Sequence, residues 1–138
     1  MDEQPLNLVL FSGTDDKLQA AAVLAAGAAA LAKPVNIFLQ YWALDAFRAD
    51  RIGRDHGLVP EAGLEGRDAV EALRTAGQAS WAETLRQVKE LGGVDIQACS
   101  LSMDLLRLEA TDLDPLVDGV EGVTAFYLNA GEGQIVFI

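Results

Sequence analysis

The chain has 138 residues, of which 51% are hydrophobic and 22% charged, and its formal net charge is -11. This composition is typical of a globular protein, and it excludes disordered, collagen-like, coiled-coil and disulfide-scaffold chains. The strong negative charge argues against nucleic-acid and anionic-membrane partners, because both are bound through basic patches.

Length and cysteine content indicate the kind of protein. A chain of this length is expected to form one domain, over residues 1–138. Cys99 is the only cysteine, so no disulfide can form within the chain. The start, Met1 to Pro5, lacks the basic residues of a signal peptide, and the longest apolar run, 18–32, is too short to cross a bilayer. We therefore expect a cytoplasmic protein.

The first part of the chain predicts a strand, a helix and a second strand. Residues 6–11 are an apolar run before the polar turn Ser12-Gly13-Thr14, as in a buried strand. The turn or Asp15 can cap a helix that proline stops after Lys33. The helix consists mainly of Ala, Leu and Val, so we expect it to be buried on most sides. Residues 35–39 predict the second strand, parallel to the first.

The segment 41–78 shows less regular patterning. It contains five glycines, with charged residues between them. Short helical stretches are predicted over 45–54 and 67–75. We expect residues 51–78, here called the flap segment, to form a flap or insertion at the edge of the sheet.

The next helix has clear start and stop signals. Ser80 and Glu83 have the spacing of a capping box, and Gly92-Gly93 ends the helix. Residues 94–98 then predict a third strand, which leads directly into Cys99.

The remaining elements complete an α/β pattern. Residues 101–108 predict a short helix, and 112–120 a loop that enters a fourth strand. Periodicity does not decide whether 125–130 is helix or strand, and 134–138 predict the last strand. The alternation predicts a three-layer sandwich, in which helices cover both faces of a mostly parallel, five-stranded sheet.

Three segments of chemical interest are predicted to meet at the carboxyl ends of the strands, where open parallel sheets bind ligands. They are the Ser12-Gly13-Thr14 loop, the Tyr41-Trp42 pair and Cys99. Cys99 follows a strand and precedes a helix, and the N–H groups and dipole at a helix start stabilise a thiolate, the nucleophilic form. The alternative is a buried structural cysteine, which is common for this residue type.

Residue spacing excludes several cysteine chemistries. Ser102 stands where a thioredoxin-type site needs its second cysteine, and Leu105 where a Cys-x5-Arg phosphate loop needs arginine. His56 is the only histidine that could serve a cysteine hydrolase, and we expect it to be solvent-exposed in the flap segment. No metal site and no cofactor are predicted, because zinc ligands and nucleotide-binding glycine patterns are missing. The chemistry that remains is transfer of sulfur by Cys99.

The residues around Cys99 carry a family resemblance. The run Ala98 to Leu105, followed by Asp112-Leu113 and Gly122-Val123, resembles the DsrE/DsrF-like family, in particular its DsrE2 branch. The aromatic segment 38–44 is similar to that branch as well. The resemblance spans nearly the whole chain and is weakest over the flap segment.

This resemblance implies a fold and a function. The fold is DsrE-like, with parallel strands flanked by helices, usually assembled as a homotrimer or homohexamer. A fourth strand near 116–121 and a turn and short helix over 122–130 are also implied. The function is sulfur relay, in which a cysteine carries a persulfide or thiosulfonate and exchanges it with a small sulfur-carrier protein of the TusA type. Cys99 matches that cysteine.

We therefore predict a cytoplasmic sulfur carrier or sulfurtransferase with Cys99 as its catalytic residue. The expected substrate-binding residues are Ser100 and Ser102 beside the transferred group, and Ser12, Gly13, Thr14, Tyr41 and Trp42 in the pocket wall. The alternative is a non-catalytic oligomeric module that binds a small ligand there and has an unreactive Cys99. A thiol peroxidase is a third possibility, for which the chain lacks a resolving cysteine.

Overall fold

The computed structural model describes residues 4–138. The elements of the first half are β1 (Leu6–Leu10), α1 (Asp15–Ala30), β2 (Val35–Leu39), α2 (Tyr41–Ala46), a 3-10 turn (Pro60–Ala62) and α3 (Gly63–Thr75). Those of the second half are α4 (Trp81–Glu90), β3 (Val94–Cys99), α5 (Ser100–Leu106), a 3-10 turn (Ala110–Asp112), β4 (Gly119–Glu121), α6 (Val123–Ala130) and β5 (Ile135–Phe137). Met1 to Glu3, on which part of the signal-peptide prediction depends, lie outside the described residues.

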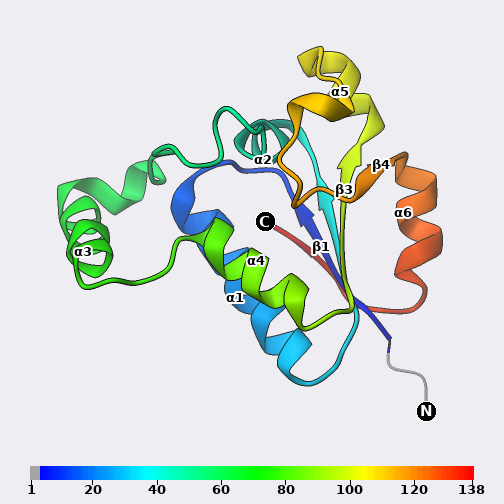
Figure 1. Cartoon of the computed structure of the whole chain (residues 1–138), viewed down its shortest axis with the longest axis horizontal. Coiled ribbons are helices and arrows are strands. Elements are labelled where there is room, and N and C mark those ends of the chain that lie inside the picture. The colour runs from blue at the N-terminus through cyan, green and yellow to red at the C-terminus, as the bar shows by residue number, and fades with distance from the viewer. Residues whose placement is uncertain (1–3) are drawn as a thin grey trace.

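All five strands form one parallel sheet, in the order β4-β3-β2-β1-β5. The register aligns apolar residues across its centre, with Leu8 beside Ile37 and Ile37 beside Ile96. Helices lie on both sides of the sheet (Figure 1). The predicted α/β sandwich is confirmed, with a sheet that is parallel throughout.

Helices α1 and α4 cover one face of the sheet (Figure 1). Leu8, Ile37 and Ile96 are fully buried beneath them, because alternate residues of a strand point to the same face. The capping box at the start of α4 is confirmed: the Glu83 N–H donates to Ser80 Oγ over 3.2 Å, and the Ser80 N–H donates to the Glu83 carboxylate over 3.3 Å.

The expectation that α1 is buried on most sides is wrong. Its buried residues form one stripe, Leu18, Ala21, Ala22, Ala25 and Ala28. Val23 and Leu24 on the other side are 58% and 44% exposed, because the small alanines bring only one face against the sheet and α4. The helix also ends at Ala30, before the predicted Lys33, since Ala32 adopts a left-handed conformation with φ 57°.

Helix α6 covers the opposite face of the sheet, here called the α6 face (Figure 1). Val9, Phe38, Cys99 and Phe126 pack there as a small core separate from the main one. The buried Asn7 of β1 and the half-buried Asn36 of β2 hold the end of α6. Asn36 Nδ2 donates both to Asn7 Oδ1 (3.0 Å) and to the carbonyl oxygen of Asn129 (3.2 Å). The implied helix over 122–130 is thereby confirmed.

The flap segment lies to one side of the sheet, where α3 stands apart from the other helices (Figure 1). None of the residues of α3 is buried. The helix begins at Gly63, earlier than the predicted 67, after the 3-10 turn. Over the predicted stretch 45–54 the structure has no helix beyond Ala46, where α2 ends. It has one helical turn there, in which the Ile52 N–H donates to the carbonyl oxygen of Arg48 over 2.9 Å.

Smaller differences concern the other elements of the second half. Helix α5 ends at Leu106, because Arg107 is left-handed with φ 56°. Strand β4 spans Gly119–Glu121, shorter than the implied 116–121, since Leu116 is buried in the main core. Among residues 4–138 the structure contains no helix with the length and apolar character needed to cross a bilayer.

Candidate functional site

Cys99 is the last residue of β3, and α5 begins at the next residue. Its side chain belongs to the small core on the α6 face, with Phe38 and Phe126. Only 5% of the residue is exposed. The thiol thus lies at the carboxyl edge of the sheet, as predicted, but beneath an apolar cover.

The two serines predicted beside Cys99 have different surroundings. Ser102 is 1% exposed, and its hydroxyl accepts the backbone N–H of Tyr41 over 3.1 Å. Ser100 is half-buried, and its hydroxyl lies beside Gly122, at the turn between β4 and α6. Ser102 therefore connects α5 with α2, whereas Ser100 lies near the start of α6.

The first loop and the start of α2 are brought together by a close backbone approach. A Cβ atom at Gly13 would lie 2.4 Å from the carbonyl oxygen of Trp42, so only glycine fits. The hydroxyls of Ser12 and Thr14 lie 3.5 Å apart in the same loop. The structure thus places the predicted pocket-wall residues next to one another.

Aromatic side chains line the α6 face beyond these residues. The ring centroid of Phe11 lies 5.0 Å from that of Tyr41 and 5.9 Å from that of Phe137. The rings of Phe38 and Phe126 are stacked with their centroids 4.9 Å apart, and both residues pack with Cys99 in the small core. Phe137 is 65% exposed. An apolar surface therefore adjoins the cover of Cys99.

Glu121 is a candidate that the sequence reasoning missed. It is the register partner of Cys99 on the neighbouring strand, so its side chain shares the α6 face. Burial, and then the negative charge of Asp95, raise the pKa of Glu121, while a hydrogen bond from Asn129 (3.1 Å) acts in the opposite direction. A carboxyl group that holds its proton more readily than usual thus lies on the strand beside the cysteine. The sequence pattern alone does not reveal its place beside Cys99, because that place follows from the pairing of β3 with β4.

His56 is placed differently from the prediction. It is half-buried, and within the described residues its Nε2 atom is buried without a hydrogen-bond partner. Its backbone N–H donates to the Asp15 carboxylate over 3.0 Å, and its ring lies 5.8 Å from that of Trp81. The expected solvent exposure is wrong, because these contacts attach the loop to α1 and α4. Within residues 4–138, no three His, Cys, Asp or Glu side chains are grouped as metal ligands.

Comparison with known proteins agrees with this architecture. Residues 2–61 match the model of the DsrE/DsrF/DrsH-like family. The uncharacterized protein YrkE of Bacillus subtilis (strain 168) is 30% identical in an alignment of 149 positions, which covers 93% of this chain and 92% of YrkE. The chain belongs to the DsrE/DsrF/DrsH-like family. The family predicted from the sequence is thereby confirmed.

Two solved structures share the fold of this DsrE/DsrF/DrsH-like chain. The ychN protein from E. coli has a TM-score of 0.58 at 12% identity, and the alignment covers 99% of this chain and 100% of that one. MTH1491 from Methanobacterium thermoautotrophicum, a protein of unknown function, has a TM-score of 0.52 at 15% identity with the same coverage. At these identities the likeness is one of fold.

Proposed function

We propose that this DsrE/DsrF/DrsH-like protein is a sulfur carrier or sulfurtransferase of a cytoplasmic sulfur relay. The observation that carries the proposal is the position of its one cysteine, Cys99, at the carboxyl end of a central strand directly before α5. Parallel α/β sheets bind their ligands at this edge. Membership of a family often linked to sulfur relay supports the same chemistry.

The reaction at Cys99 is an exchange of sulfur–sulfur bonds. The thiolate attacks the outer sulfur of a donor persulfide, a bond forms between the two sulfurs, and the donor's own thiolate leaves with the electron pair of the broken bond. With tetrathionate, the product on Cys99 is a thiosulfonate and the leaving group is thiosulfate. Neither step needs an external oxidant or reductant. A second thiolate can then take the outer sulfur and release Cys99.

The residues around Cys99 stabilise the thiolate, bind the transferred group or form the pocket wall in this proposal. N–H groups at the start of α5 stabilise the thiolate, and the Ser100 hydroxyl binds the transferred group. The Ser102 hydroxyl acts by holding the Tyr41 backbone, on which the pocket wall depends. That wall comprises Ser12, Gly13, Thr14, Tyr41 and Trp42.

The partners proposed are a small carrier protein of the TusA type and further copies of this chain, as a homotrimer or homohexamer. Exposed apolar side chains on and beside α6 support an assembly or docking surface near Cys99. They include Val123, Tyr127, Leu128 and Phe137.

The test compares the folded protein with the same chain unfolded in urea. Each is incubated with tetrathionate or polysulfide, and the adduct is followed by intact-protein mass spectrometry, with Cys99→Ser as the control for labelling at sulfur. A carrier cysteine reacts faster in the folded protein than in the unfolded chain, and reductant removes the adduct. Phe126→Ala, which thins the cover of the thiol, should increase the folded rate further.

Burial of Cys99 favours a second candidate, a non-catalytic oligomeric module that binds a small ligand at the same edge. In that case the cysteine packs the core and reacts only when the chain unfolds. A folded rate far below the unfolded rate, with every donor and with iodoacetamide, would exclude the carrier and leave this second function.

A further inference from the structure

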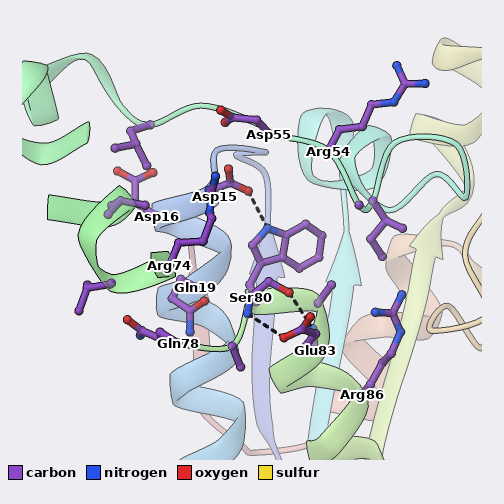
Figure 2. A pocket seen from close by; sticks show the side chains of 18 residues that line it. Asp15, Asp16, Gln19, Arg54, Asp55, Arg74, Gln78, Ser80, Glu83 and Arg86 are labelled. Atoms are coloured by element: carbon purple, nitrogen blue, oxygen red, sulfur yellow. Dashed lines mark hydrogen bonds between the residues drawn. The ribbon is translucent and has the colours of Figure 1, made fainter. Parts of the chain in front are cut away.

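A cavity of about 580 Å³ lies between the flap segment and the starts of α1 and α4 (Figure 2). It is on the side of the sheet opposite the α6 face, and so away from Cys99. Its volume falls in the range of small-molecule sites in proteins.

Apolar side chains form much of the cavity wall. Val70 and Leu73 of α3 face Trp81 of α4 and two residues of the loop before α3, Ile52 and Leu58. Leu73 is 52% exposed, although helices of this kind bury their apolar stripe. The stripe of α3 therefore borders the cavity without packing against the protein, and a ligand with an apolar body would cover it.

The two carboxylates of α1 in this wall already accept hydrogen bonds from other groups of the chain. Asp15 accepts the indole N–H of Trp81 over 2.8 Å (Figure 2). It also accepts the backbone N–H of His56 over 3.0 Å. Asp16 accepts the backbone N–H of Val59 over 3.2 Å. Both acids lie in the first turn of α1, where the helix dipole stabilises negative charge.

The other two carboxylates are engaged in the same way. Glu83 belongs to the capping box of α4. Asp55 accepts the backbone N–H of Gly57 over 2.8 Å, and this bond, together with the charge of Arg74, holds the pKa of Asp55 below its usual range. The acidic groups of the wall therefore have partners before any ligand arrives.

The guanidinium groups of the wall have fewer ion-pair and hydrogen-bond partners than the carboxylates. Among residues 4–138, Arg54 has no ion pair or side-chain hydrogen bond, and Arg74 has only an exposed pair with Glu71 at 3.4 Å. Arg86 pairs with Asp114. Arg54 lies in the loop after α2, Arg74 on α3 and Arg86 on α4, and Figure 2 labels all three among the residues that line the cavity. Among the described residues, the charged groups of the wall that have hydrogen-bond donors to spare are thus the guanidinium groups, which suit a carboxylate or sulfonate. The side-chain amides of Gln19 and Gln78 in the same wall are also without a hydrogen-bond partner among these residues.

We infer that this cavity binds a small organic anion, a carboxylate or sulfonate with an apolar body. Arg54 and Arg74 bind the anionic group, and Val70 and Leu73 contact the body, above the buried Trp81. The site goes beyond the sulfur chemistry proposed for Cys99 and does not depend on it.

Decanoate and decyltrimethylammonium, which share an alkyl chain and differ in charge, test this site. Each is titrated into the whole folded chain, and binding is followed by amide chemical shifts and calorimetry. Decanoate should bind once per chain and shift amides around the cavity, whereas the cation should bind at least about tenfold more weakly. Arg74→Gln and Leu73→Asp should each weaken decanoate binding by about tenfold or more.

One variant of the same helix and one distant arginine variant serve as controls. Leu64→Asp in α3 and Arg107→Gln after α5 change exposed residues that do not line the cavity, so they should leave the affinity for decanoate unchanged. Cys99→Ser should bind decanoate as tightly as the wild-type protein, because Cys99 does not line the cavity. This result is expected whether or not Cys99 carries sulfur. The inference is overturned if the cation binds as tightly, if neither probe binds, or if Arg74→Gln and Leu73→Asp behave like their controls. It is also overturned if cavity amides shift with protein concentration alone, since a second copy would then fill the space.

Discussion

Tyr41, the first residue of α2, has a backbone conformation that tyrosine rarely adopts, with φ 43°. Its N–H donates to the buried hydroxyl of Ser102, 61 positions away in the chain. Strained residues of this kind persist only where the surrounding structure holds them, and they are frequent at functional sites. The hydrogen bond therefore stabilises the conformation of Tyr41 at the start of α2.

Ser102→Ala should lower the free energy of unfolding by about 1–2 kcal/mol, because it leaves the half-buried Tyr41 N–H without a partner. Urea denaturation measures the change. Ser100→Ala is the matched control, since the Ser100 hydroxyl has no hydrogen bond among the described residues and should change stability by less than about 0.5 kcal/mol. Equal effects of the two substitutions would contradict the role of the Ser102 bond.

Glu121 makes a pH-dependent contribution whose sign follows from its raised pKa, caused first by burial and then by Asp95. The folded protein holds this proton more tightly than the unfolded chain, so ionised Glu121 is destabilising at neutral pH. The penalty disappears as the pH falls through the raised pKa. Glu121→Gln keeps an acceptor for Asn129 and should raise the melting temperature by about 1–3 °C at pH 7.

The gain from Glu121→Gln should vanish near about pH 4, where a glutamate is largely protonated in both states. Melting curves at the two pH values measure it, with Glu65→Gln on the exposed part of α3 as the control. A gain at about pH 4 equal to that at pH 7 would show that protonation is not its cause.

Helices α3 and α4 show how differently two neighbouring elements are stabilised. Helix α4 starts with a capping box and buries Trp81, Leu85 and Val88. Helix α3 has no side-chain cap and no buried residue. Short helices gain most of their stability from packing of an apolar face, so α3 depends on whatever covers that face.

Hydrogen exchange should therefore separate the two helices. In the ligand-free protein, the amides of α3 should exchange at least about 100-fold faster than those of α4, because local opening of α3 exposes almost no buried apolar surface. Mass spectrometry of labelled peptides measures both helices in one experiment. Equal protection would mean that α3 is packed in solution by something outside the single chain.

At the scale of the whole molecule, the sheet separates two regions of chemical interest. Cys99 and Glu121 lie on the α6 face, and the arginine-lined cavity lies on the side of α1 and α4. The strands between them form hydrogen bonds along their length, so each region is held by its own set of helices. Variants in one region are therefore suitable controls for experiments on the other.

Much of this arrangement was predictable from the sequence, because its signals are local. The strand Val35–Leu39, the capping box at Ser80 and the glycine stop after α4 follow from neighbouring residues, and the structure confirms them. Cys99 at a strand end follows from the same kind of pattern. Residues 125–130 are apolar at both helical and strand periods, so their helix was indicated only by the family resemblance.

The sequence by itself determined the order of strands and helices, the acidic surface and the place of the cysteine along its strand. Only the tertiary structure decided that the thiol lies beneath Phe126, that Ser102 holds Tyr41, and that α3 leaves a cavity beside Trp81. The physical reason is distance along the chain. Periodicity and capping act within a few residues, whereas the contacts of Cys99 with Phe126 and of Ser102 with Tyr41 join segments tens of residues apart. The cavity, in turn, depends on how the flap segment, α1 and α4 lie together in space.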